Sequence, residues 1–155
     1  MTEEFLARAM DLYGDSVYRL ALCRLQSVCD AEDVYQDCFL RFYQQSGADS
    51  WESERIKAWL LRVAINRCRD YGRSRANHKL ISLDDAPVPC VDNVEAAVTA
   101  WDAVSHLPEK QRIIFHLYYS EGYKAKEIKE LMGISTYSVR TNLDKARNAL
   151  RKELY

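Results

Sequence analysis

Apolar residues recur every three or four positions along most of the chain, which is the spacing of one face of an α-helix. Near the start, this spacing predicts a helix with an inner face of Phe5, Leu6, Ala9, Met10, Tyr13, Val17 and Leu20. A second helix is predicted over residues 30–45, where Asp30 can cap the first turn and Val34, Cys38, Phe39 and Phe42 point inward. A third is predicted over residues 54–75, with Ile56, Leu60, Val63, Ala64 and Tyr71 on its buried side.

The same spacing predicts four more helices in the second half of the chain. Val94, Ala97, Val98 and Trp101 mark one that breaks at Leu107 and Pro108, and the next runs from Pro108 until Gly122 stops it. A short helix through Ile128, Leu131 and Met132 ends at Gly133, which can take the left-handed backbone that closes a helix. Ser135 then caps a last helix with the inner stripe Val139, Leu143, Ala146 and Leu150.

These elements predict an all-α protein of two small helical domains. Strand-like alternation is missing from the pattern, so an α/β cofactor fold has little support. The stretch "ISLDDAPVPCVDN" at residues 81–93 holds two of the three prolines and three acids without an apolar period. We interpret it as a flexible acidic linker, with domains at residues 1–79 and 94–155 and the linker at residues 80–93.

Length and composition fit a folded soluble protein. The chain has 155 residues, of which 48% are apolar, and it has no run of 18 apolar residues that could span a membrane. The start "MTEEFLARAM" carries two acids where a secretory signal would be basic, so we expect a cytoplasmic protein with no membrane insertion. The five cysteines form no C-x-x-C pair and are expected to be buried and reduced.

The charge alternates in sign along the chain although its formal sum is only −1. Residues 1–50 hold nine acids and four basic residues, whereas residues 55–79 hold eight basic residues and one acid. Residues 80–109 have six acids and no Lys or Arg, and residues 110–155 have ten basic residues and five acids. Two separated basic segments favour a protein that grips a polyanion at two places, although a solvated helix face can also be basic.

The third predicted helix concentrates this positive charge on one side. Arg62, Asn66, Arg69 and Arg73 stand at helical spacing, so three guanidinium groups and an amide share a face. Such a face can neutralise phosphates, and the amide can both donate to and accept from a base edge. Trp59 lies at its margin, where it either stacks on an unpaired base or packs into the core.

Residues 123–154 have the pattern of a helix-turn-helix, in which a short helix, a glycine-containing turn and a longer helix follow one another. The outward side of the longer helix presents residues that can contact bases and phosphates: Tyr137, Ser138, Arg140, Thr141, Lys145 and Arg147. The alternative is an ordinary helical hairpin in a bundle. On the second helix a polar stripe of Asp33, Gln36, Asp37 and Arg41 reads, without further context, as a solvated face.

Three segments, in order, resemble bacterial RNA polymerase sigma factors of the compact, extracytoplasmic-function group of the sigma-70 family. They are "AEDVYQDCFLRFY", "AWLLRVAINRCRDYGR" and "LPEKQRIIFHLYYSEGYKAKEIKELMGISTYSVRTNLDKARNAL". The resemblance covers nearly the whole chain and implies a non-catalytic specificity subunit that directs promoter-specific initiation. Its implied partners are promoter DNA, the clamp helices of the polymerase's largest subunit, the flap of the second-largest subunit and, in many members, an anti-sigma factor.

The resemblance also implies roles for particular residues. The stripe of Asp33, Gln36, Asp37 and Arg41 falls where relatives dock on the polymerase. The face of Arg62, Asn66, Arg69 and Arg73 falls where they hold the opened minus-ten element, and the loop "SGADSWESE" falls where they pocket a flipped base. The outward residues of the last helix fall where relatives contact the minus-thirty-five element. Lys129, Tyr137, Asn142 and Asp144 depart from the family pattern, so Lys129 must extend its ammonium to water or the helix packing must differ.

Two other classes of protein remain open. A free-standing transcriptional regulator would share the helix-turn-helix and use its first domain to dimerise or sense a ligand. The Arg-Asn face disfavours it, because a dimer interface is expected to be apolar at its centre. An enzyme is the weaker alternative: His78, His106 and His116 have no metal-ligand or catalytic-triad spacing, and no Gly-rich phosphate loop occurs. We therefore expect no cofactor and no metal site.

Overall fold

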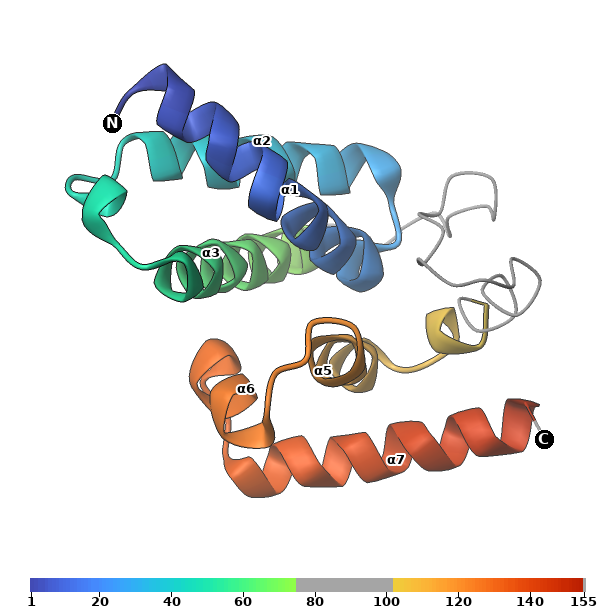
Figure 1. Ribbon diagram of the computed structural model, residues 1–155. Coiled ribbons are helices and arrows are strands. Elements are labelled where there is room, and N and C mark those ends of the chain that lie inside the picture. Colours follow the sequence, from blue (N-terminus) through green and yellow to red (C-terminus); the bar gives the residue numbers. More distant parts are fainter. Residues whose placement is uncertain (75–101, 155) are drawn as a thin grey trace. The chain divides into compact units, whose positions relative to one another are not determined.

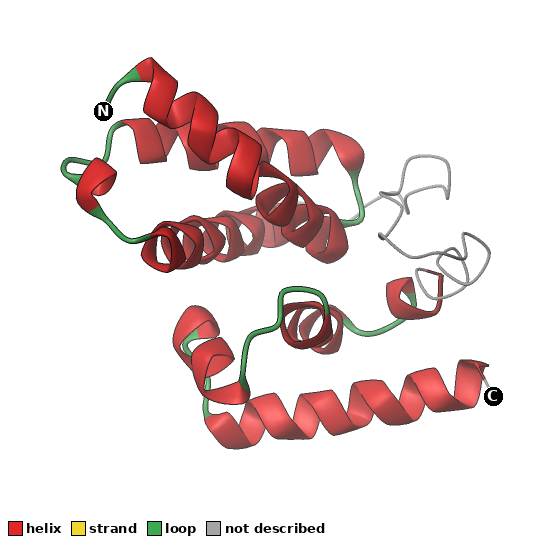
Figure 2. Cartoon of the chain, viewed as in Figure 1, coloured by secondary structure: helices red, strands yellow, loops and turns green. Residues whose placement is uncertain are grey.

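The computed structural model describes residues 1–74 and 102–154, apart from the side chains of residues 72–74 and 154. Within these ranges the chain forms helices and turns without any strand, which confirms the predicted all-α class (Figures 1 and 2). The chain divides into two compact units, Met1–Lys79 and Leu80–Tyr155. The predicted linker and the helix marked by Val94, Ala97, Val98 and Trp101 lie outside the described residues.

Three helices build the first unit: α1 (Glu3–Leu25), α2 (Val28–Tyr43) and α3 (Ser53–Ser74). Each of them packs against the other two, and a short 3-10 turn, η1 (Ala48–Ser50), lies between α2 and α3 (Figure 1). Val17, Leu20, Val34, Phe42 and Leu60 are fully buried where the helices meet. The amphipathic spacing in the sequence thus corresponds to a real three-helix core.

The predicted cap of the second helix is wrong by three residues. Ser27 is the N-cap of α2, and its hydroxyl accepts a hydrogen bond from the Asp30 amide at 3.3 Å. Asp30 is itself buried in the first turn of the helix. The helix can start this early because Gln26 adopts a left-handed backbone with φ 53°, which turns the chain sharply after α1.

The buried face of α3 is wider than its sequence indicates. Ile56, Leu60 and Ala64 are buried as predicted, whereas Val63 and Tyr71 are only partly buried. The helical spacing missed two further core residues, Leu61 and Ile65, and Cys68, which was expected to be buried as a cysteine, lies on the same face. The face is wide because α3 packs against both α1 and α2, so two adjoining sides of the helix are covered.

The second unit contains α5 (Glu109–Tyr119), α6 (Ala125–Met132) and α7 (Thr136–Leu154), preceded by a helical turn at residues 102–105. α5 packs along α7, and α6 contacts both. α5 ends at Tyr119 rather than continuing to Gly122, because the chain reverses there and the Tyr123 amide bonds back to the Leu117 carbonyl at 3.0 Å. Gly122 takes the positive φ of 76° that this reversal needs.

The turn between α6 and α7 forms as the sequence predicts. Gly133 has φ 68°, and its amide donates to the Lys129 carbonyl at 2.9 Å, which closes α6. The Ser135 hydroxyl accepts from the Ser138 amide at 3.0 Å and caps α7. The stripe of Val139, Leu143, Ala146 and Leu150 is buried against the rest of the unit, which confirms the predicted inner face of the last helix.

The cysteines follow the expectation only in part. Cys23, Cys38 and Cys68 are free and buried, and burial raises the pKa of Cys38 to about 12. Cys29 is exposed, so the expectation that it is buried is wrong, and Cys90 lies outside the described residues. The low reactivity that burial gives a thiol therefore applies to three of the described cysteines.

Candidate functional site

The basic face of α3 is open to solvent. Arg62, Asn66 and Arg69 are all exposed and lie on one side of the helix, while the side chain of Arg73 lies outside the described residues. The opposite side of α3 is fixed by the core, so these three groups are held at helical spacing on a rigid element. Their positions suit successive contacts along a nucleic-acid backbone.

A series of aromatic rings leads from the core to the start of this face. The ring of Trp59 lies 5.7 Å from that of Phe42 and 6.1 Å from that of Trp51, measured between centroids. The guanidinium of Arg55 stands 4.2 Å above the Trp51 ring. Trp59 thus packs on the buried Phe42. The outer end of the series is the pair of Arg55 with Trp51, a residue of the loop "SGADSWESE".

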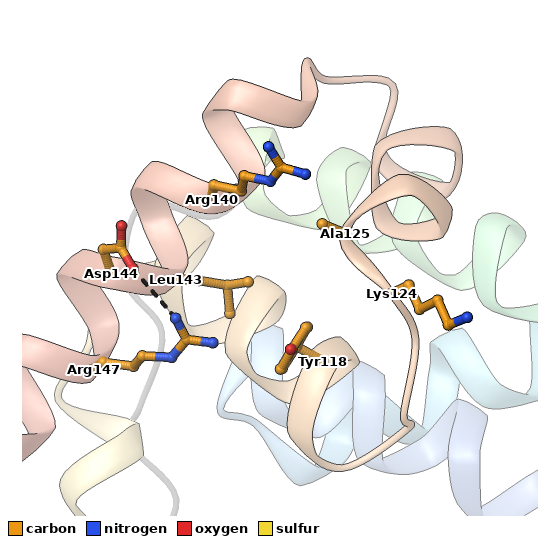
Figure 3. Close-up of a pocket in the computed structure, with 7 residues that line it drawn as sticks. All are labelled: Tyr118, Lys124, Ala125, Arg140, Leu143, Asp144 and Arg147. Atoms are coloured by element: carbon orange, nitrogen blue, oxygen red, sulfur yellow. Dashed lines mark hydrogen bonds and ion pairs between the residues drawn. The ribbon is translucent and has the colours of Figure 1, made fainter.

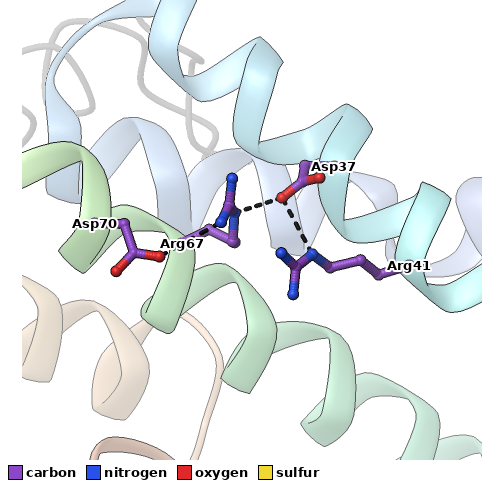
Figure 4. A network of polar contacts seen from close by, with 4 residues as sticks. All are labelled: Asp37, Arg41, Arg67 and Asp70. Carbon is purple, nitrogen blue, oxygen red and sulfur yellow. Dashed lines mark hydrogen bonds and ion pairs between the residues drawn. The ribbon is translucent and has the colours of Figure 1, made fainter.

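On α2, the predicted polar stripe is exposed with one exception. Asp33, Gln36 and Arg41 face solvent, but Asp37 is partly buried because its carboxylate forms an ion pair with Arg67 of α3 (Figure 4). Asp37 also lies 3.3 Å from the Arg41 guanidinium, and Arg67 continues to Asp70 at 3.4 Å. Asp37 therefore links α2 to α3 in addition to any external contact.

Two exposed apolar side chains adjoin this stripe and were missed by the sequence analysis. Leu40 is 60% exposed and Tyr43 is 40% exposed, at four and seven positions after Gln36. They share its side of α2. The sequence analysis assigned these two residues neither to the inner face of the helix nor to its polar stripe. Exposed apolar side chains next to polar ones are typical of a protein-binding surface.

The outward residues of α7 differ in how accessible they are. Tyr137 is 80% exposed, and Arg140 and Lys145 are also exposed, whereas Ser138 and Thr141 are partly buried. The Ser138 carbonyl accepts from the Asn142 side-chain amide at 2.7 Å. Of the predicted contacts, the side chains that are exposed on α7 are therefore a phenol, a guanidinium and an ammonium.

Arg147 is turned toward α5 rather than outward. Its Nε donates to the Tyr119 hydroxyl at 2.6 Å, and a second guanidinium nitrogen lies 3.3 Å from the Asp144 carboxylate (Figure 3). The guanidinium also stands 5.5 Å from the ring centroids of both Tyr118 and Tyr119. The hydrogen bond with Tyr119 raises the pKa of Arg147 above its usual value.

A basic pocket lies beside α7 in this unit. Its volume is about 410 Å³. It is lined by Tyr118 of α5, Lys124 before α6, and Arg140, Asp144 and Arg147 of α7 (Figure 3).

Lys129 of α6 plays no part in this pocket. Its side chain is exposed, and the contact of α6 with α7 uses the buried Ile128, Leu131 and Met132. The Lys129 ammonium thus lies in water, which is the first of the two arrangements that the sequence left open for this residue.

Comparison with known proteins identifies the family. The family model described as "Sigma-70 region 2" matches residues 9–78, and the one described as "Sigma-70, region 4" matches residues 98–150. The ECF RNA polymerase sigma factor SigM of Bacillus subtilis is 31% identical over 93% of this chain and 91% of its own length. This chain belongs to the extracytoplasmic-function group of the sigma-70 family. The predicted resemblance is confirmed.

Other relatives match this sigma factor over different fractions of their own length. SigW of Bacillus subtilis is 28% identical over 98% of this chain and 90% of its own length. The probable RNA polymerase sigma factor RfaY of Xanthomonas campestris is 31% identical over 98% of this chain, which spans 41% of that relative. With these relatives, the two sigma-70 regions make the chain an RNA polymerase sigma factor that directs promoter-specific transcription initiation.

Solved structures share the fold of this sigma factor. The sigma factor RpoE of Bartonella quintana, crystallised with the anti-sigma factor NepR, aligns with a TM-score of 0.73 at 20% identity over 99% of this chain and 98% of its own. CnrH, solved with the cytosolic domain of CnrY, aligns at 0.67 and 20% identity over 99% of this chain and 89% of its own. Among the described residues of the sigma factor, no helix is long and apolar enough to cross a membrane.

The sigma factor also carries an exposed polar cluster that its sequence did not indicate. Asp102, His106 and Glu153 bring their nitrogen and oxygen ligand atoms within 4.8 Å of one another. His106 Nδ1 lies 2.9 Å from a Glu153 carboxylate oxygen, although the two residues are 47 positions apart. These residue types can hold a divalent cation. The ion pair between His106 and Glu153 explains why these two side chains lie close together without a bound cation.

This ion pair predicts a pH dependence of stability. The hydrogen bond that His106 donates to Glu153, with the charges of Asp102 and Glu153, raises the pKa of His106 above the usual value of an imidazole. A raised folded-state pKa gives stabilisation that is fully present below the unfolded pKa and is lost as pH rises through the folded one. Melting temperatures of wild type and His106→Gln should therefore differ at pH 5.5 and converge at pH 9. A constant difference across this range would contradict the ion pair.

Proposed function

We propose that this sigma factor uses one domain to dock on core RNA polymerase and open the minus-ten element, and the other to fix the minus-thirty-five element. In this proposal residues 1–79 are region two, residues 80–93 are a linker and residues 94–155 are region four. The chain acts in the cytoplasm and is itself non-catalytic. The observation that carries the proposal is a separate exposed basic face on each unit of a chain from this family.

The proposal assigns three sets of residues. Docking on the clamp helices of the largest subunit uses Asp33, Gln36, Asp37 and Arg41 of α2, with Leu40 and Tyr43 beside them. The opened minus-ten strand is held by Arg62, Asn66, Arg69 and Arg73. The minus-thirty-five element is contacted by Tyr137, Ser138, Arg140, Thr141 and Lys145. We withdraw Arg147 from that set as a direct contact, because its guanidinium is engaged by Tyr119 and Asp144.

Two weak DNA contacts on one tether are enough for specific initiation. Binding of one domain raises the effective concentration of the other at its own element, so neither needs high affinity alone. Anchoring on polymerase, including a contact of region four with the flap of the second-largest subunit, sets the spacing between the two. This explains why the isolated chain is expected to bind promoter DNA poorly.

Transcription in vitro from a genomic promoter library tests the proposal. Core polymerase with this chain is expected to initiate at a defined set of promoters that share two spaced elements. The free-standing regulator predicts the opposite behaviour: tight binding of the purified chain to its DNA site without polymerase, and no initiation on adding core enzyme.

An anti-sigma factor is a further proposed partner. Two structural neighbours, RpoE and CnrH, were solved with NepR and with the cytosolic domain of CnrY respectively. A protein that covers the exposed α2 surface would compete with core polymerase. Competition of a candidate partner with core enzyme for this chain, lost when Leu40 is changed to Ala, would support such a surface.

Charge reversal on α2 tests the docking assignment. Asp37→Lys is expected to weaken binding to core polymerase about tenfold, or about 1.4 kcal/mol, without unfolding the chain. The measurement is a titration of labelled core enzyme, with circular dichroism as the check on folding. Unchanged binding would remove the docking role of the stripe.

The internal ion pair of Asp37 requires a matched control. Arg67→Gln breaks the same link between α2 and α3 while leaving the acidic residue in place. If Arg67→Gln weakens docking as much as Asp37→Lys does, Asp37 acts by holding the helices together rather than by contacting polymerase. A smaller loss in the control assigns the difference to the carboxylate itself.

A further inference from the structure

Asp144 stands on the outward side of α7, among the groups assigned to the minus-thirty-five element. Its side chain is 70% exposed. It follows Tyr137 by seven positions and Arg140 by four, so the three share one side of the helix. The buried stripe of α7 lies on the other side. A carboxylate at this position is unexpected on a helix that approaches DNA, because phosphates repel it.

The carboxylate is held in place through one of its two oxygens. Asp144 Oδ1 lies 3.3 Å from an Arg147 nitrogen, while Oδ2 has no hydrogen-bond partner within the described part of the chain. Arg147 cannot turn freely, because its Nε donates to the Tyr119 hydroxyl at 2.6 Å and its guanidinium lies against two tyrosine rings. Tyr119 of α5 thus holds Arg147 of α7, and Arg147 in turn orients Asp144, as the pair in Figure 3 shows.

A fixed carboxylate in a major groove distinguishes bases by their donors. It can only accept hydrogen bonds, and cytosine presents an N4 amino donor with no acceptor beside it. Guanine presents two acceptors and thymine presents an acceptor and a methyl group, so both oppose a carboxylate. Adenine offers a donor, but its N7 acceptor stands next to it. Cytosine is therefore the base that Oδ2 suits best.

We infer that Asp144 is a specificity-determining residue that selects a cytosine at one position of the minus-thirty-five element, with Arg147 and Tyr119 as positioning residues. The inference rests on the proposed function of α7. Pairing with Arg147 offsets part of the repulsion between Asp144 and phosphates. Arg140 then remains available for a neighbouring base or phosphate, since no residue in the described ranges forms an ion pair with it.

A promoter library with a randomised minus-thirty-five element, transcribed by core polymerase with the full chain, tests this inference. Wild type is expected to favour cytosine over guanine or thymine by about tenfold at one position, the effect of one mismatched base at the lower end of its range. Asp144→Ala is expected to lose that preference at that position alone. Tyr119→Phe removes the hydrogen bond to Arg147 and is expected to lower the same preference without changing the others.

Controls separate base reading from general repulsion. Glu130→Gln removes an exposed acid from α6 of the same unit and is expected to leave the preference profile unchanged. If Asp144→Ala raises transcription from all sequences equally, or leaves the profile as in wild type, the inference is overturned. If wild type shows no dependence on any minus-thirty-five sequence, the proposed function of α7 fails instead, which is a distinct result.

Discussion

Replacing Arg62 and Arg69 together by glutamine is expected to reduce promoter opening by about a hundredfold while binding to core polymerase stays unchanged. Each guanidinium that contacts nucleic acid contributes about 1 to 3 kcal/mol, and a hundredfold loss corresponds to about 2.7 kcal/mol for the pair. Both side chains are exposed on α3, so their loss leaves the core of the first unit intact. Permanganate reactivity of unpaired thymines in the minus-ten element measures the opening directly.

A charge-matched control shows whether position matters. Arg8→Gln with Arg151→Gln removes two exposed guanidinium groups from α1 and from the end of α7, outside the proposed contacts. This variant is expected to open promoters as wild type does. The Arg62 and Arg69 variant should also lose about two units from the salt dependence of promoter binding, one for each phosphate contact. Equal losses of promoter opening in the two double variants, or undiminished opening by the Arg62 and Arg69 variant, would contradict the assignment of the α3 face to the minus-ten element.

The sequence was sufficient to predict those features of the fold that depend on residues within one or two helical turns of each other. The turn at Gly133 and the cap at Ser135 formed as predicted, because a left-handed glycine and a serine hydroxyl act on backbone groups three or four residues away. The inner face of α7 was predicted for the same reason: a helix that must bury one side has its apolar residues at fixed spacing.

Interactions between helices were beyond this kind of prediction. Asp37 pairs with Arg67, 30 residues further on, and Arg147 pairs with Tyr119, 28 residues earlier. Each residue therefore looked like a free surface charge in its own helix. The structure shows a different role for each residue. Pairing with Arg67 lets Asp37 hold α2 against α3, and pairing with Tyr119 turns the Arg147 side chain away from the outward side of α7.

The sequence analysis overlooked some apolar residues of α3 and α2 for a related reason. Leu61 and Ile65 are buried because α3 touches two partner helices, which its own periodicity cannot reveal. Conversely, Leu40 and Tyr43 are exposed although their residue types suggest a core. A single amphipathic stripe describes a helix with one neighbour, whereas burial in this unit depends on how many neighbours each helix has.

Phe42→Ala is expected to destabilise the first unit by about 3 to 5 kcal/mol, the usual cost of removing a fully buried aromatic ring. Phe42 has no exposed surface, and its ring centroid lies 6.2 Å from that of Phe5 of α1 and 5.7 Å from that of Trp59 of α3. The ring thus joins all three helices. Because small domains are stable by only about 5 to 15 kcal/mol, this loss is a large part of the total. Urea unfolding followed by circular dichroism measures it.

The adjacent Tyr43→Ala variant is the matched control, because Tyr43 is 40% exposed and its removal should change stability by less than about 1 kcal/mol. Tyr43 also adjoins the proposed docking stripe, so its variant is expected to remain folded yet bind core polymerase less tightly. Phe42→Ala should lose binding only in proportion to the fraction unfolded. If both variants are equally destabilised, α2 is oriented differently from the arrangement described, and its exposed side cannot be the docking surface.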